Sequence, residues 1–324
     1  MASPANALEE AVASILDEVP KDQETGPRIA FQNVAPLDQA ARVAAVDGGS
    51  TVVLDVQSTG LYCVRAGYCL REPGDRILDR TTARVYRTVT RRGLAGAWKP
   101  RLVQYAWGVD APVPAFDATR MVPQLAEAER ILAEYDAARR ALHELQRGDL
   151  LLLDGSLGDE DRYRALQDSL EERAHDVGVH VAGLSKDSGL SLGGVLPLPL
   201  ELEELALARN VPTPWWTDVT EPLGKRDDGH RLLVARFDAR APAFRLDVAG
   251  DPAPAVARVA ELCNDAAYPG YPYPLARAHA RVHFESGEAV DLRHDLETIV
   301  ARRRGHRLSF RLFSKGRDVL QLVD

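Results

Sequence analysis

Apolar residues recur at intervals of three and four over several stretches of the chain, which is the pattern of amphipathic helices. The clearest stretch runs from Pro123 to Arg147, with a proline near its start and Gly148 directly after its end, as is typical of helix termini. Further helices are predicted over residues 160–177 and, near the N-terminus, from Asn6 to Val19. Two or three more are expected toward the C-terminus.

Short apolar runs separated by turn-forming residues predict the strands. Three precede the long helix and four follow it, at residues 42–47, 51–57, 61–70, 150–154, 179–184, 231–237 and 243–248. Glycines between the first three predict tight turns and an antiparallel meander. The proline-rich residues 190–228 are predicted to be irregular chain that covers the core. This order favours an α/β fold, a ribonuclease-H-like mixed sheet flanked by helices, with irregular and helical additions and with the first and fourth strands as neighbours.

The chain has 324 residues, enough for one large core with additions. We expect residues 1–27 to form an N-terminal helix and linker, and residues 28–324 to form a single domain. No stretch is long and apolar enough to span a membrane, and the first residues lack the pattern of a signal peptide. The three cysteines have no metal-finger spacing. We therefore predict a cytoplasmic protein that does not bind a membrane.

Two predicted strands end in an aspartate followed by a glycine, at Asp47-Gly48 and at Asp154-Gly155. Carboxylates on neighbouring strands can share divalent cations, and two ions about 3.5–4 Å apart can activate water and stabilise the leaving oxygen of a phosphodiester. Oxygen ligands favour Mn²⁺ or Mg²⁺ over zinc. The alternative is that each aspartate only caps the turn or helix that follows it.

A third carboxylate is predicted on the long helix. Ile131, Glu134 and Ala138 share one side of it, so Glu134 lies on or beside the face that packs inward. A carboxylate at such a position needs a metal or a partner, because an unpaired buried charge is costly. Asp136 is the competing candidate for the third acid, and an ion pair between Glu134 and Arg130 is the structural alternative.

The formal net charge of −8 opposes binding to DNA, because affinity for DNA depends on Lys and Arg that neutralise phosphates. Positive charge must then be concentrated in a channel, or another protein must deliver the strand. The densest basic cluster comprises Arg302, Arg303, Arg304, His306, Arg307 and Arg311. We expect Arg302, Arg303 and Arg307 to face a DNA channel or a partner, with at least one of them contacting the DNA backbone. The alternative is a solvated helix end, where basic residues favour the C-terminal dipole.

Five short segments, in this order, resemble the pattern of NurA nucleases. They are Val46-Asp47-Gly48-Gly49-Ser50, the helix with Glu134-Tyr135, Leu153-Asp154-Gly155-Ser156-Leu157, Gly183-Leu184-Ser185-Lys186, and Tyr271-Pro272-Tyr273-Pro274-Leu275-Ala276-Arg277-Ala278-His279. The resemblance extends from about Arg42 to His283. Gly49 departs from relatives in which serine directly follows Asp-Gly.

The resemblance implies a ribonuclease-H-like fold and Mn²⁺-dependent cleavage of DNA, with two ions per site and Mg²⁺ as a substitute. It further implies a 5′–3′ exonuclease and single-strand endonuclease that forms a homodimer. Such an enzyme works with a HerA-type hexameric ATPase in DNA end resection and double-strand-break repair. Carried over by position, it implies that Asp47, Glu134, Asp154 and His279 form the catalytic, metal-binding centre. The apolar stripe of the N-terminal helix is a candidate for docking the ATPase, or for packing against the dimer mate or the core.

Three residues have both a chemical and a structural interpretation. His279 can bind metal or shuttle a proton, or it can be an ordinary core or surface histidine, with His283 as its rival. Lys186 can bind the scissile phosphate or form a surface ion pair. Tyr271 can stack on an unpaired base or pack within its loop.

Two other classes of function stay open. One is an actin-like or sugar-kinase-like phosphotransferase, which would need a glycine-rich adenosine loop that the sequence lacks. The other is a non-catalytic module that binds a partner through the same core. The chain has no phosphate-binding Gx₄GK[ST] loop, no HExxH and no GxSxG, which argues against a self-contained motor, a zincin and an α/β-hydrolase.

Overall fold

The computed structural model describes most of the chain between residues 29 and 305. The described ranges are 29–37, 40–56, 59–74, 76–81, 85–90, 121–158, 163–186, 188–192, 196–224 and 229–305. The predicted N-terminal helix and linker, and Arg307 with the residues after it, lie outside them. None of the described helices is long and apolar enough to cross a membrane.

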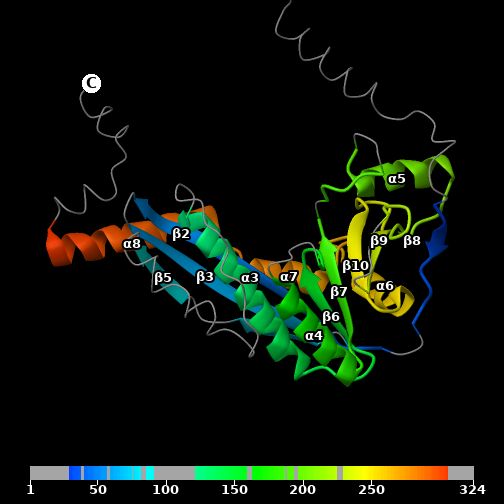
Figure 1. Cartoon of the computed structure of the whole chain (residues 1–324), viewed down its shortest axis with the longest axis horizontal. Helices are drawn as coiled ribbons and strands as arrows, with labels where there is room; N and C mark the ends of the chain where they lie inside the picture. The colour runs from blue at the N-terminus through cyan, green and yellow to red at the C-terminus, as the bar shows by residue number, and fades with distance from the viewer. Residues whose placement is uncertain are drawn as a thin grey trace, which may run out of the picture. The chain divides into compact units, whose positions relative to one another are not determined.

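The chain divides into two compact units, each built from several segments. The first unit consists of Met1–Ala45, Cys69–Leu78 and Ala141–Arg277, and the second of Val46–Tyr68, Asp79–Arg140 and Ala278–Asp324. Strand β2 begins in the first unit and continues into the second. Figure 1 shows both units, with labels on the elements where there is room.

The first unit holds most of the strands. They are β1 (Phe31–Asn33), the start of β2 (Val43–Val56), β6 (Leu150–Asp154), β7 (His180–Ser185), β8 (Trp215–Asp218), β9 (His230–Arg236) and β10 (Phe244–Ala249). The strand order is β1-β8-β9-β10-β7-β6-β2. Strand β6 pairs parallel to β7, whereas β10 pairs antiparallel to both β7 and β9. The sheet is therefore mixed, and the expected pairing of the strand at Arg42 with the strand at Leu150 is confirmed.

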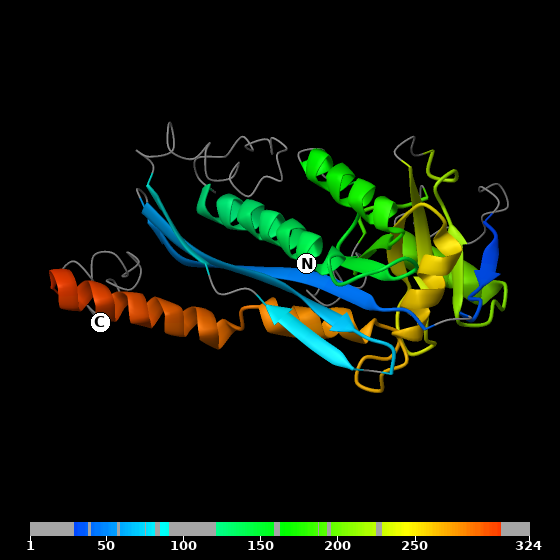
Figure 2. The ribbon, with the colours of Figure 1, turned by 90° about the horizontal axis from the view of Figure 1, so that it is seen from below.

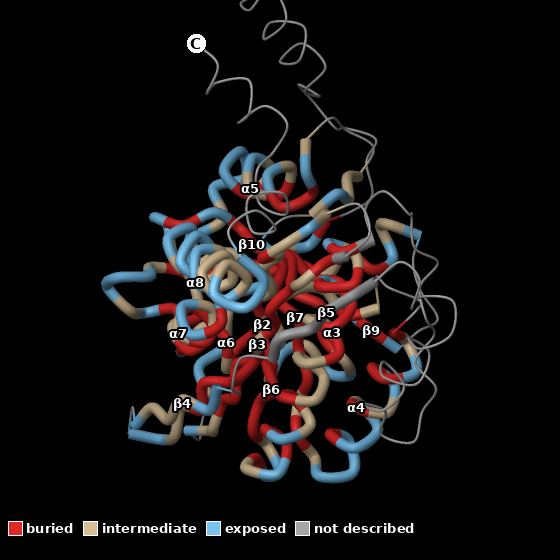
Figure 3. The backbone as a smooth tube through the Cα atoms, turned by 90° about the vertical axis from the view of Figure 1, so that its left-hand side faces the viewer, coloured by how far each residue is buried: buried red, intermediate tan, exposed pale blue. Residues whose placement is uncertain are grey.

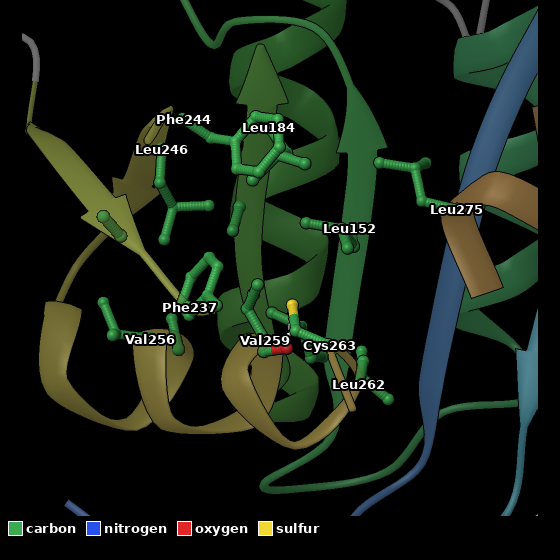
Figure 4. Packing of buried hydrophobic residues seen from close by; sticks show 14 of the residues in the cluster. Leu152, Leu184, Phe237, Phe244, Leu246, Val256, Val259, Leu262, Cys263 and Leu275 are labelled. Carbon is green, nitrogen blue, oxygen red and sulfur yellow. Dashed lines mark hydrogen bonds between the residues drawn. The ribbon is translucent and has the colours of Figure 1, made fainter. Parts of the chain in front are cut away.

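Helices cover both faces of this sheet. They are α4 (Arg164–Val177), α5 (Leu198–Ala208), α6 (Pro252–Glu261) and the start of α7 (Tyr273–Val282). One core cluster joins Leu152, Leu184 and Leu246 to Val259 of α6 and Leu275 of α7 (Figure 4). Alternate residues of β9 point the opposite way and pack against Leu198 and Leu202 of α5.

The second unit is a smaller layered structure. It contains the rest of β2, most of β3 (Thr59–Arg71), part of β4 (Ile77–Thr81), β5 (Val85–Thr90), α3 (Met121–Leu142), the end of α7 and α8 (Ser286–Arg304). Tyr62 and Val64 of β3 pack against α3, whereas Cys63 packs toward Leu292 and Leu296 of α8. The two helices therefore cover opposite faces of β2 and β3, as Figure 2 shows.

Three sequence-based expectations need correction. The predicted turn at Gly48-Gly49 is absent, because β2 runs unbroken from Val43 to Val56. The predicted irregular region 190–228 contains helix α5 and strand β8. The long helix ends at Leu142, before Gly148, because the buried Asp149 accepts hydrogen bonds from the backbone N–H groups of Gln146 and Arg42 and draws the chain into a turn.

Candidate functional site

The second unit places Asp47 beside His279. Asp47 lies within β2 at the end of the apolar run 43–46 and is only 3% exposed. Its Oδ1 accepts a hydrogen bond from the N–H of Gly48, and its Oδ2 lies 2.7 Å from Nδ1 of His279. His279 is in the last turn of α7, where its ring stacks on that of His283 with centroids 4.9 Å apart. The buried carboxylate thus has a hydrogen-bonding partner, as a buried polar group requires.

Gly48 brings Glu134 against the same strand. A Cβ atom at Gly48 would lie 2.7 Å from both Cγ and Oε1 of Glu134, so a larger residue would require this side chain to move. Glu134 belongs to α3 and pairs with Arg130 one turn earlier, which is the ion pair that the sequence left open. Asp136 instead pairs with Arg139 and Arg140, at 3.1 and 2.6 Å.

Arg130 interacts with three carboxylates of this region. Burial by itself would lower the pKa of Arg130, but the nearby carboxylates of Glu134, Glu127 and Asp47 raise it above its usual range. The guanidinium therefore stays charged at every physiological pH. It also holds the pKa of Glu127 below its ordinary value, mainly through a side-chain hydrogen bond. One guanidinium is thus shared by three carboxylates.

The first unit places Lys186 beside Asp154. Asp154 ends β6, and its Oδ2 lies 3.2 Å from Nζ of Lys186, which directly follows β7. That ammonium also lies 5.3 Å from the ring centroid of Tyr271. The ring of Tyr271 contacts Phe244 edge to face, with centroids 5.6 Å apart, so the tyrosine packs on the core and faces the lysine.

A buried ion pair supports the turn after Asp154, and the sequence did not reveal it. Asp247 is fully buried, and its Oδ2 lies 2.7 Å from the Arg245 guanidinium and accepts a hydrogen bond from the N–H of Leu157. A Cβ at Gly183 would collide with the carbonyl of Gly155, so the turn lies directly on β7. Arg245 and Asp247 alternate with apolar residues in β10, a pattern that normally indicates one solvated face.

In the sequence, the predicted DNA-contacting arginines lie at the end of α8 and after it. Arg303 lies in the last turn of α8 and is exposed, and Arg307 falls outside the described residues. None of the residues of α8, all of which are described, is buried, and Figure 3 shows the helix as exposed or intermediate along its length.

Comparison with solved structures identifies the fold. The NurA nuclease from Sulfolobus solfataricus is similar at a TM-score of 0.56 and 16% identity, over 92% of this chain and 95% of that one. A NurA structure with manganese is similar at a TM-score of 0.56 and 12% identity, over 93% of this chain and 99% of that one. A structure of NurA bound to dAMP and manganese is similar at a TM-score of 0.50 and 11% identity, over 93% of this chain and 94% of that one. The predicted ribonuclease-H-like mixed sheet flanked by helices is confirmed.

Sequence comparison is consistent with this fold and identifies the family. No curated protein sequence is similar enough to the chain to count as a match. The NurA domain, however, matches residues 41–212, which is more than half of the chain and includes both strand-end aspartates. The chain therefore belongs to the NurA family, and this membership supports a nuclease function that uses a divalent metal.

Proposed function

We propose that the chain is a Mn²⁺-dependent DNA nuclease in which Asp47, Asp154 and His279 hold the metal. Glu134 belongs to the same centre by the family resemblance. The observation that carries the proposal is the buried Asp47 carboxylate, 2.7 Å from the His279 imidazole, within a NurA domain. Two oxygens and a nitrogen form a ligand set that suits Mn²⁺ and Mg²⁺ better than a thiolate-preferring metal.

The positions of the two aspartates along β2 and β6 support assigning both to one centre. The N–H of Leu150 donates to the carbonyl of Arg42, and these two strands are neighbours in the sheet. Asp47 is the fifth residue after Arg42, and Asp154 is the fifth after Asp149, which accepts from the N–H of Arg42. Each aspartate therefore stands five residues after a residue of the contact that joins the starts of the two strands.

The residues near this centre have separate roles in the proposed hydrolysis. A bound divalent ion would polarise the phosphodiester and lower the pKa of an attacking water. Asp47 orients the imidazole of His279 through its hydrogen bond, a role that carboxylates commonly have beside metal-binding histidines. The ammonium of Lys186, beside Asp154, can contact a non-bridging phosphate oxygen. Arg130 pairs with Glu134 and so places a positive charge beside this carboxylate.

The finer assignments rest on the family. We propose a 5′–3′ exonuclease and single-strand endonuclease that acts as a homodimer with a HerA-type ATPase in DNA end resection. A NurA structure with dAMP and manganese supports DNA and Mn²⁺ as the substrate and cofactor. The net charge of −8 and the absence of a Gx₄GK[ST] loop from the sequence favour a separate motor that supplies DNA.

Digestion of end-labelled single- and double-stranded DNA tests the proposal. Wild-type protein should cut with Mn²⁺ and stop with EDTA, and Asp47→Ala should lower the rate by more than about 100-fold, because charge stabilisation is lost. Asp55→Ala is the matched control, since Asp55 is an exposed carboxylate of the same strand. A folded Asp47→Ala protein that cuts at the wild-type rate would overturn the assignment. A wild-type protein that neither binds Mn²⁺ nor cuts DNA would favour a non-catalytic module.

A further inference from the structure

Arg65 makes a dense set of contacts that the proposed chemistry does not use. It lies on β3, and its side chain is 12% exposed. Its Nε donates to the carbonyl of Val282 at 2.8 Å, and its Nη2 donates to the carbonyl of His283. Nη1 and Nη2 meet the two carboxylate oxygens of Glu288 at 3.0 and 3.1 Å. The guanidinium carbon lies 4.2 Å from the ring centroid of Phe284.

The two carbonyls belong to the end of the helix that carries His279. Helix α7 ends at Val282, and the last carbonyls of a helix have no partner within the helix. A positive charge is favourable there, because the aligned peptide dipoles leave partial negative charge at the C-terminus. Arg65, which lies on β3, therefore caps the C-terminal end of α7.

Strand β2 contacts the same turn two residues after Asp47. A Cβ at Gly49 would collide with the carbonyl oxygen of Val282, so the backbones of β2 and α7 meet directly. The last turn of α7 is thus held by β2 at Gly49 and by the guanidinium of Arg65. His279 lies one turn before this point, with Nδ1 2.7 Å from Asp47.

We infer that Arg65 is a positioning residue for the proposed metal centre, which sets His279 against Asp47 by anchoring the end of α7. The inference rests on the proposed function. The guanidinium suits this task because its planar fork can serve several acceptors at once, whereas a lysine ammonium presents a single point charge. Glu288 holds the other side of the fork through both of its carboxylate oxygens.

The test compares Arg65→Met with Glu288→Gln. Methionine keeps much of the side-chain length but donates no hydrogen bond, whereas Glu288→Gln leaves both contacts to α7 in place. Mn²⁺ affinity is measured by titration calorimetry on variants that circular dichroism shows to be folded, together with kcat and KM on labelled DNA. We expect Arg65→Met to weaken Mn²⁺ binding by about 10-fold or more, as for other residues that orient metal ligands. We expect kcat to fall with KM for DNA little changed, and Glu288→Gln to stay near wild type.

The outcomes separate this inference from the proposed function. If His279→Ala binds Mn²⁺ and cleaves DNA like wild type, the metal assignment itself fails. If His279→Ala is impaired but folded Arg65→Met binds Mn²⁺ with wild-type affinity, Arg65 only stabilises the fold and the inference fails alone. Should Arg65→Met not fold, Arg65→Lys replaces it, because lysine cannot serve both carbonyls and Glu288 in this geometry. Wild-type Mn²⁺ affinity in Arg65→Lys would then overturn the inference.

Discussion

At the scale of single residues, the two glycines after Asp47 determine what can approach β2. Neither serves a turn, since the strand is continuous across them. Gly48 admits the side chain of Glu134, and Gly49 admits the backbone at the end of α7. A glycine pair that resembles a turn in the sequence therefore acts as a contact surface. A serine in place of Gly49 would collide with the carbonyl oxygen of Val282.

Gly49→Ala should be strongly destabilising, because its methyl group would overlap a backbone oxygen that cannot rotate away. We expect a loss of about 3 kcal/mol in the free energy of unfolding, at the upper end for overpacked sites. Urea denaturation followed by circular dichroism measures it. Gly287→Ala in α8 is the control, since a methyl group there meets nothing within 4 Å. A Gly49→Ala protein as stable as this control would show that β2 and α7 do not meet as described.

At the scale of elements, β10 and the turn after β6 depend on one buried ion pair. Arg245 and Asp247 are 3% and 0% exposed and stand across from β7, with Arg245 paired to Ser185 and Asp247 to Gly183. Asp247 also accepts from the N–H of Leu157, three residues after Asp154. The position of this strand-end aspartate thus depends on a carboxylate from a strand about 90 residues later in the chain.

Asp247→Leu should destabilise the protein by about 3–5 kcal/mol, because it leaves the Arg245 charge buried without its carboxylate. The measurement is again the free energy of unfolding in urea. Glu72→Gln removes a carboxylate from a more exposed ion pair with Arg76 and should cost less than about 1 kcal/mol. Equal losses in the two variants would mean that the buried ion pair contributes no more to the free energy of unfolding than the exposed one.

At the scale of the whole molecule, the excess of acidic residues limits how the chain can hold DNA. A polyanion can still bind where arginines are concentrated, and the densest cluster begins at the end of α8. Arg303 is exposed there, as a DNA contact requires. The contact itself stays a prediction.

Replacing Arg303 and Arg307 together with glutamate tests that prediction. DNA affinity should fall, and the slope of log affinity against log salt should become shallower by roughly 1 for each phosphate that the arginines no longer neutralise. Fluorescence anisotropy with labelled single-stranded DNA, over a range of salt at fixed pH, provides both quantities. Mn²⁺ affinity is the control and should not change. If affinity and slope both equal those of wild type, these arginines are solvated surface.

The sequence by itself determined the elements and the ends on which the candidate ligands lie. Apolar runs that stop at Asp47 and Asp154 predicted β6 and the start of β2, and the helical period predicted α3 with Glu134 on it. These features are local, because burial sets the period of apolar residues along one strand or helix. The order of the elements then sufficed to predict the mixed sheet.

Only the tertiary structure decided which side chains meet. Gly49 and the end of α7 are more than 200 residues apart in the chain, as are Arg65 and His283. Arg245 and Asp247 alternate with apolar residues as they would in a half-exposed strand, yet the turn after β6 covers them. No local pattern records such contacts, because they depend on packing in three dimensions. The sequence therefore indicated the chemistry, and the packing selected the residues that hold it in place.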